Sequence, residues 1–269
     1  MSVVATIAGH VVREAVRSRV LHGVTLFVAG MALTAPIAGR LSAGQDLKVV
    51  KDLGLAAIHL AGLLVAVSMG IRLVAWEMAR RTADAVLSKP VRRHEFIVGQ
   101  YVGLVATLGL ALAVMTAFLY ALMGAAAWWA PETGFMPAPP APAADPAILK
   151  AVFLILVQLA VVAAASLCFS TFASPALAAV AACALYVAGH FSAELRRLDE
   201  VVDSPLAASL AAGLSYVLPN LAAFDVKNAV VHQLPVTAWH VALTTLSGTA
   251  YILAFLVLAA AAFSRRDLT

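Results

Sequence analysis

The order of apolar and charged positions along the chain predicts a bundle of membrane-spanning helices. Several long stretches contain no Asp, Glu, Lys or Arg, and a helix of about 20 apolar residues crosses a bilayer. The stretch 151–193 is long enough for two such helices, and the small polar residues and proline of 170–175 mark a turn between them. We therefore expect an all-α membrane protein with six transmembrane helices, at about 20–39, 53–75, 97–127, 148–170, 175–193 and 239–263.

One further apolar stretch, 204–225, does not fit a seventh span. It contains Gly213, Pro219 and Asn220, and proline removes a backbone hydrogen bond that a spanning helix needs. We expect re-entrant or external helices there, between the fifth and sixth spans. The whole chain, 1–269, is predicted to form a single transmembrane domain.

Residues 1–19 predict an amphipathic interfacial helix. Val4, Ile7, Val11 and Ala15 recur at helical spacing and form an apolar face. Basic side chains near that face can reach lipid headgroups, which makes membrane lipids an expected partner. These side chains are Arg13, Arg17 and Arg19. The helix either anchors the first span or transmits force into the bundle, and the sequence leaves both readings open.

Composition and charge agree with a membrane protein. The chain is 63% hydrophobic and 12% charged, whereas soluble domains have about 45–50% apolar and about 25% charged residues. Six spans place 11 of the Lys and Arg residues on the side of both termini and 7 on the other side. Basic residues collect on the cytoplasmic side, so both termini are expected there. The same rule explains the net charge of +4, and no nucleic-acid partner is expected.

Few residues inside the predicted spans carry chemistry. His59 and His190 fall within spans, where they are either ligands of a haem iron or, as we favour, neutral hydrogen-bonded side chains. Cys168 and Cys183 lie in apolar runs and are expected to pack as small apolar residues. We expect no catalytic residue and no metal site. The proline-rich outer loop 131–146 is expected to be a linker, and a docking site for a periplasmic partner is the alternative.

The segment 76–96 is the sizeable connection on the cytoplasmic side. It continues the second span as a helix, with Glu77 and Arg81 at the i,i+4 spacing of an ion pair. Pro90 ends that helix, because proline excludes its predecessor from helical geometry, and the next helix opens at Arg92. Charge alone favours two ordinary basic flanks, with a docking knob for a cytoplasmic partner as the alternative.

The residues of this segment resemble the cytoplasmic loop of ABC-2 type transporter permeases. The likeness is greatest to the branch that includes the permeases of nitrous-oxide-reductase copper maturation and of gliding motility. The shared pattern is an acid, Arg and Thr, then Leu-Ser-Lys-Pro, then Arg, and finally acid-Phe and Gly. In this chain the pattern is carried by Glu77, Arg80, Arg81, Thr82, Leu87, Ser88, Lys89, Pro90, Arg92, Arg93, Glu95, Phe96 and Gly99. Lys51–Leu55 also resembles that branch, whereas Gln100 and Ala83–Ala85 depart from it.

The resemblance implies that Glu77–Phe96 is a coupling loop that docks on a cytoplasmic ABC ATPase. The ATPase is expected to be a separate polypeptide, because this chain has no Gly-x-x-x-x-Gly-Lys-Ser/Thr loop. ATP and Mg would bind to that partner, so this chain would be no enzyme and would hold no cofactor. A second permease protomer, most simply a homodimer, a prokaryotic plasma (inner) membrane and export are also implied.

A second reading comes from another class of protein. The chain could be a non-transporting membrane anchor that recruits an ATPase to an extracytoplasmic maturation or motility complex. The sequence leaves open the substrate, the transport direction, the identity of the ATPase and whether the dimer is homo- or heteromeric. A lipid or a hydrophobic small molecule is slightly favoured as substrate over a peptide or a sulfur- or metal-related species, because the spans are apolar.

Overall fold

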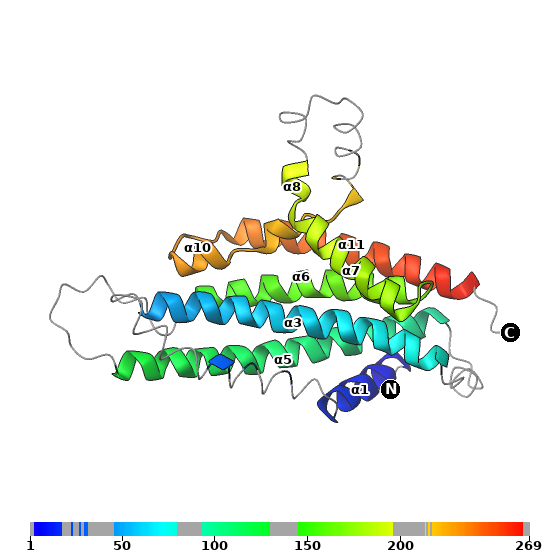
Figure 1. Ribbon diagram of the computed structural model, residues 1–269, viewed down its shortest axis with the longest axis horizontal. Helices are drawn as coiled ribbons and strands as arrows, with labels where there is room; N and C mark the ends of the chain where they lie inside the picture. The colour runs from blue at the N-terminus through cyan, green and yellow to red at the C-terminus, as the bar shows by residue number, and fades with distance from the viewer. Residues whose placement is uncertain are drawn as a thin grey trace.

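The structure, a computed structural model, describes residues 3–17, 23, 27, 30, 31, 46–79, 93–129, 145–195, 213, 215 and 217–265. Within these ranges the chain forms helices and no strand, as the sequence predicts (Figure 1). The helices are α1 (Val3–Arg17), α3 (Asp46–Ala79), α5 (Arg93–Trp129), α6 (Ala147–Ser170), α7 (Pro175–His190), α8 (Ser192–Leu195), η2 (Leu221–Phe224), α10 (Lys227–Val231) and α11 (Ala238–Arg265).

Four of the described helices are long and apolar enough to cross a membrane. Their apolar parts are Leu47–Leu73, His94–Ala125, Ala147–Ser170 and Ala238–Phe263. These parts overlap the predicted second, third, fourth and sixth spans. Helix α7 covers the predicted fifth span but is shorter and ends at His190. The predicted span 20–39 lies outside the described residues except at four positions, of which Met31 is buried in the apolar core.

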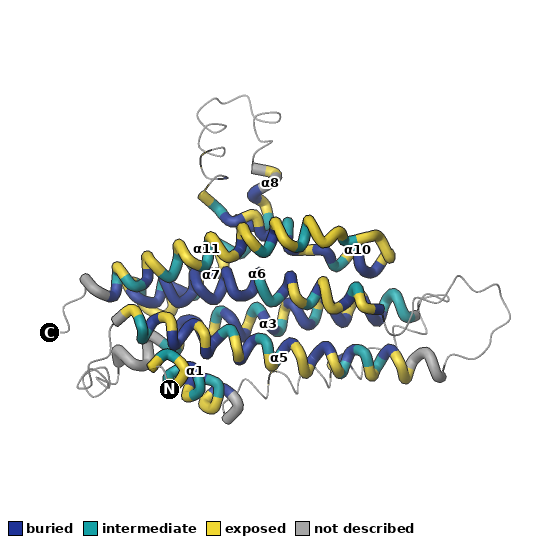
Figure 2. Tube along the Cα trace, turned by 180° about the vertical axis from the view of Figure 1, so that it is seen from behind, coloured by how far each residue is buried: buried dark blue, intermediate teal, exposed yellow. Residues whose placement is uncertain are grey.

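Helix α6 occupies the centre of the bundle. Of its most apolar window, 78% is buried, against 17% for α11, and Figure 2 shows α6 largely in the colour of buried residues. Its neighbours are α3, α5, α7 and α11. Small residues permit close approach between helices. A Cβ at Gly70 of α3 would lie 2.8 Å from the Cβ of Ser166 on α6, so these two helices pack with little space between them.

Helix α1 packs with its apolar face against the first turns of α5. Ala8, Val11 and Ala15 are buried on that face, while the polar residues, Arg13 among them, are exposed. The contact is close because α5 has glycine at Gly99 and Gly103: a Cβ at Gly103 would lie 2.6 Å from the Cβ of Val11. The amphipathic helix is therefore joined to the bundle through its apolar face. The side chain of Arg17 and all of Arg19 lie outside what is described.

The described residues just before α11 pack along α6. We name residues 217–237 the cap segment. The backbone oxygen of Leu221 accepts a hydrogen bond from the side chain of Gln158 on α6, and the backbone oxygen of Val236 accepts one from Lys150. Lys150 lies eight residues before Gln158 on the same helix. Eight helical residues span about 12 Å, so the cap segment runs beside the first half of α6. Of the predicted external region 204–225, residues 204–212, 214 and 216 lie outside the described part.

The close contact between α3 and α6 predicts a local sensitivity to side-chain size. We expect Gly70→Leu to destabilise the protein by about 1–3 kcal/mol, because the added side chain overfills a packed interface. The backbone oxygen of Ala163, 3.3 Å from the position of a Cβ, cannot move aside. The measurement is the apparent Tm of purified protein in lipid nanodiscs. Gly124→Leu is the matched control, since a Cβ there meets nothing within 4 Å; an equal loss in both variants would contradict this account of the interface.

Candidate functional site

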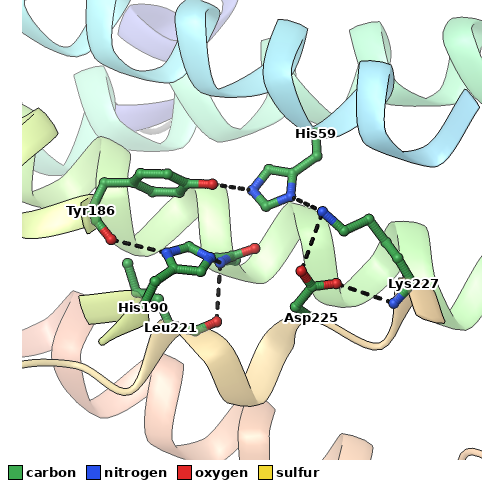
Figure 3. Close-up of polar contacts among 7 residues, drawn as sticks. His59, Tyr186, His190, Leu221, Asp225 and Lys227 are labelled. Carbon is green, nitrogen blue, oxygen red and sulfur yellow. Dashed lines mark hydrogen bonds and ion pairs between the residues drawn. The ribbon is translucent and has the colours of Figure 1, made fainter. Parts of the chain in front are cut away.

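A group of polar side chains lies inside the bundle where the cap segment meets α3, α6 and α7. We name it the outer cluster: His59, Gln158, Tyr186, His190, Asp225 and Lys227, all of which except Gln158 are labelled in Figure 3. Gln158 is fully buried and His59 is 4% exposed. Polar and ionisable groups within membrane spans are costly and mark functional sites, so the outer cluster is a candidate on physical grounds.

Lys227 and His59 begin a directional set of hydrogen bonds. Nζ of Lys227 lies 2.9 Å from Nδ1 of His59 and 3.3 Å from a carboxylate oxygen of Asp225. An ammonium group can only donate, so Nδ1 of His59 accepts and its proton is on Nε2. That Nε2 lies 3.0 Å from the hydroxyl of Tyr186 and donates to it. The contacts therefore fix His59 as a neutral imidazole with one tautomer.

His190 and Gln158 continue this set with the opposite tautomer. Nδ1 of His190 lies 2.9 Å from the backbone oxygen of Tyr186, and a carbonyl can only accept, so Nδ1 carries the proton. Nε2 of His190 then accepts from the amide nitrogen of Gln158 at 3.2 Å. The same amide nitrogen donates to the backbone oxygen of Leu221 at 3.0 Å. Both histidines of the predicted spans are thus hydrogen-bonded. Among the described residues, no group of three His, Cys, Asp or Glu side chains could hold a metal ion.

A buried ion pair lies nearer the end of the bundle at which α3, α6 and α11 begin, which we name the outer end after the side of the membrane that the sequence predicts for it. Nζ of Lys51, on a fully buried side chain, contacts the carboxylate of Asp145 and donates to the backbone oxygen of Val230 at 2.8 Å. The other carboxylate oxygen of Asp145 accepts from the backbone nitrogen of Ala147 at 2.8 Å. The hydroxyl of Tyr120 donates to the backbone oxygen of Asp145 at 2.7 Å. This one pair therefore joins α3, α5, α6 and the cap segment.

Sequence reasoning located these charges without pairing them. Lys51 and Asp145 precede the predicted second and fourth spans, which puts them on the same side of the membrane, but they are 94 residues apart in the chain, and no local spacing relates them. Gln158 and Tyr186 were missed. A signal for Gln158 exists, since it is the one amide side chain in the uncharged stretch 151–193. Such a residue in a span needs a partner, because an unsatisfied polar group in hydrocarbon is expensive.

The opposite end of the bundle, the inner end, carries what the structure describes of the predicted coupling loop. Glu77 lies in the last turn of α3, and Arg93, Glu95 and Phe96 lie in the first turn of α5. The ring of Phe96 stacks on Phe263 of α11, with ring centroids 6.0 Å apart. The other predicted coupling residues, Arg80, Arg81, Thr82, Leu87, Ser88, Lys89, Pro90 and Arg92, lie outside the described residues.

Long apolar helices around a buried central helix define a multi-pass membrane protein. The comparison with protein families makes this more specific, because residues 5–268 match the family model described as ABC-2 family transporter protein. The chain belongs to that family. No curated protein matches it. Membership implies a membrane protein that works with an ABC ATPase, which confirms the resemblance at the level of the family; the finer branch stays a prediction.

The buried pair of Lys51 and Asp145 predicts a large and asymmetric mutational effect. We expect Lys51→Met to destabilise the protein by about 3–5 kcal/mol, because it leaves a buried carboxylate without its cation. Adding Asp145→Asn should recover much of this loss, since an amide oxygen can still accept from the nitrogen of Ala147. The measurement is the apparent Tm in nanodiscs.

Lys48→Met is the matched control for that experiment. Lys48 lies one turn earlier on α3 and is half-buried, so its substitution should change the Tm little. The account fails if Lys51→Met is as mild as Lys48→Met, or if the double variant is no more stable than Lys51→Met alone.

Proposed function

We propose that this chain is the membrane-spanning permease subunit of an ABC-2 exporter in a prokaryotic inner membrane. It has six spans with both termini in the cytoplasm, and it works as a homodimer. A separate cytoplasmic ATPase docks on Glu77–Phe96, and that partner binds ATP and Mg and hydrolyses the nucleotide. The permease itself catalyses no reaction. Family membership supports the coarse role, and the arrangement of the inner end supports the coupling.

The observation that carries the proposal is the junction of α1, α5 and α11 at the inner end. Helix α5 is the helix into which the coupling loop leads. Its first turns hold α1 through Gly99 and Gly103, and they hold the last turns of α11 through the ring pair of Phe96 and Phe263. Packed interfaces of this kind transmit displacement because they have little free volume. A push on the coupling loop would therefore move α1, α5 and α11 together.

The displacement can continue to the centre of the bundle. Tyr101 of α5 lies five residues after Phe96, about a turn and a half along the helix, and its hydroxyl donates to the backbone oxygen of Ala160 on α6 at 3.2 Å. Ala160 is two residues from Gln158 of the outer cluster. The inner junction and the outer cluster are thus linked through α5 and α6 by a short series of direct contacts, which is what a permease driven from its cytoplasmic side requires.

ATPase capture tests the proposed partner. Tagged protein, gently solubilised from membranes, should co-purify with a stoichiometric P-loop ATPase. Lys89→Glu with Arg92→Glu should abolish this binding by reversing the charge of the coupling loop. Lys48→Glu, a charge reversal at the outer end, is the control and should retain the ATPase. If the folded protein captures no ATPase in several mild detergents, or if both charge reversals have the same effect, the proposed docking site is wrong.

Coupling is tested separately from docking. We expect Gly103→Leu to displace α1 from α5, because the new side chain would occupy the place of Val11 and of the backbone of Ala8. The ATPase should still bind, while ATP hydrolysis by the complex should approach the rate of the ATPase alone. Gly109→Ala on the same helix is the control, since its Cβ meets only Leu156, at 3.9 Å. A Gly103→Leu complex that hydrolyses ATP at the unmodified rate would contradict the role of the inner junction.

A further inference from the structure

One set of hydrogen bonds attaches the cap segment to α3 and α6 at two of its residues, Lys227 and Leu221. Lys227 is bound to His59 of α3, and Leu221 is bound to Gln158 of α6. Between these two points the set runs through Tyr186 and His190 of α7. Figure 3 shows this arrangement as a nearly closed ring of contacts that begins and ends on the cap segment. Each of these two attachments involves one histidine that accepts a hydrogen bond, whereas Lys51, Lys150, His240 and Tyr251 bind other backbone oxygens of the cap segment.

We propose that the outer cluster is a proton-sensitive latch, in which protonation of His59 and His190 breaks the attachments of the cap segment at Lys227 and Leu221. In the closed arrangement one ring nitrogen of each histidine accepts a hydrogen bond, and a proton on that nitrogen would remove the acceptor. Release lets both rings take up a proton. The open state therefore binds more protons than the closed state, and acid on the outer side favours opening.

His59 controls the attachment at Lys227. A proton on Nδ1 would replace the acceptor by a donor and would set an imidazolium against an ammonium at 2.9 Å. Among the residues that the structure describes, the other ionisable groups that face His59 are Asp225 on the cap segment and, on α7, Tyr186 and His190. Near Gly62, the side chain that α5 places against this part of α3 is Leu112, which is apolar and carries no charge. Asp225 is the carboxylate of the cluster, and one carboxylate cannot hold two adjacent cations as well as it holds one.

The geometry also decides which cation leaves. His59 is buried in the middle of α3, and its ring cannot reach solvent without a movement of that helix. The side chain of Lys227 is 18% exposed, that of Asp225 is 34% exposed, and both lie at the surface of the cap segment. Lysine has a long flexible side chain that reaches water readily. Protonation of His59 therefore drives the side chain of Lys227 into water. The neighbouring Val226, which is buried in the closed arrangement, then becomes accessible to water.

His190 controls the attachment at Leu221. A proton on Nε2 of His190 would meet the amide nitrogen of Gln158, donor against donor, at 3.2 Å. Rotation of the amide relieves this contact by presenting Oε1, which has no hydrogen-bond partner in the described part of the chain. The backbone oxygen of Leu221 then loses the nitrogen that binds it. Protonation of either histidine thus weakens one end of the same segment, and both act in the same direction, as in other histidine-based pH switches.

The test measures access to Val226 from water. The chain has two free cysteines, Cys168 and Cys183, which are first replaced by serine. Val226→Cys is then labelled in nanodiscs with a membrane-impermeant maleimide at a series of pH values between about 8 and about 4.5. Histidine side chains become protonated as the pH falls through this range. His232→Cys on the exposed part of the cap segment gives the reference rate, so the ratio of the two rates removes the pH dependence of the thiol itself.

We expect the labelling ratio to rise severalfold as the pH falls. His59→Gln with His190→Gln keeps neutral acceptors and should make the ratio independent of pH. Lys227→Met should give a high ratio at every pH, because the attachment beside Val226 is already lost. A ratio that stays constant in the unmodified cluster, or that rises equally in the double glutamine variant, would overturn the proposal. The assay contains no ATPase, so its failure would leave the proposed function standing.

Discussion

The burial of α6 is the constraint on which the rest of the structure depends. A helix with apolar neighbours on nearly every side must satisfy its few polar groups inside the protein, and α6 does so at its start and at its middle. Asp145, just before the helix, is bound to Lys51 of α3 and Tyr120 of α5. Gln158, halfway along, is bound to α7 and to the cap segment. Any displacement of α6 therefore breaks or moves contacts to all of its neighbours at once.

This arrangement explains how two distant ends of the molecule can act together. The inner junction of α1, α5 and α11 is apolar and close-packed, whereas the outer cluster is polar and directional. Apolar packing with glycines transmits movement but sets no threshold, because its contacts are weak individually. Buried hydrogen bonds set a threshold, since an unpaired buried group is costly. A permease needs both properties. One end must move with the ATPase, and the other end must stay closed until the helix displacement is large enough to break its hydrogen bonds.

The sequence predicted the helical class, the places of the long apolar helices and the family, because these depend on hydrophobic periodicity and on residues close together in the chain. The turn between α6 and α7 lies where Ser170–Pro175 indicated it. The outer cluster could not be predicted, since Lys227 and His59 are 168 residues apart and Tyr186 and His59 are 127 apart. Only the three-dimensional packing of the cap segment beside α6 brings them together. The close contact of α1 with α5 was also missed, although Gly99 and Gly103 have the spacing that close helix crossings use.

The central claim is that nucleotide state at the inner end changes the outer end. The most direct measurement is the labelling ratio of Val226→Cys to His232→Cys in the complex with its ATPase, with and without ATP trapped by vanadate, at one fixed pH. The account predicts that trapping changes the ratio severalfold, that Gly103→Leu abolishes the change while the ATPase stays bound, and that Gly109→Ala preserves it. A ratio unaffected by nucleotide in a stable complex would contradict a coupled permease and would favour a membrane anchor for the ATPase.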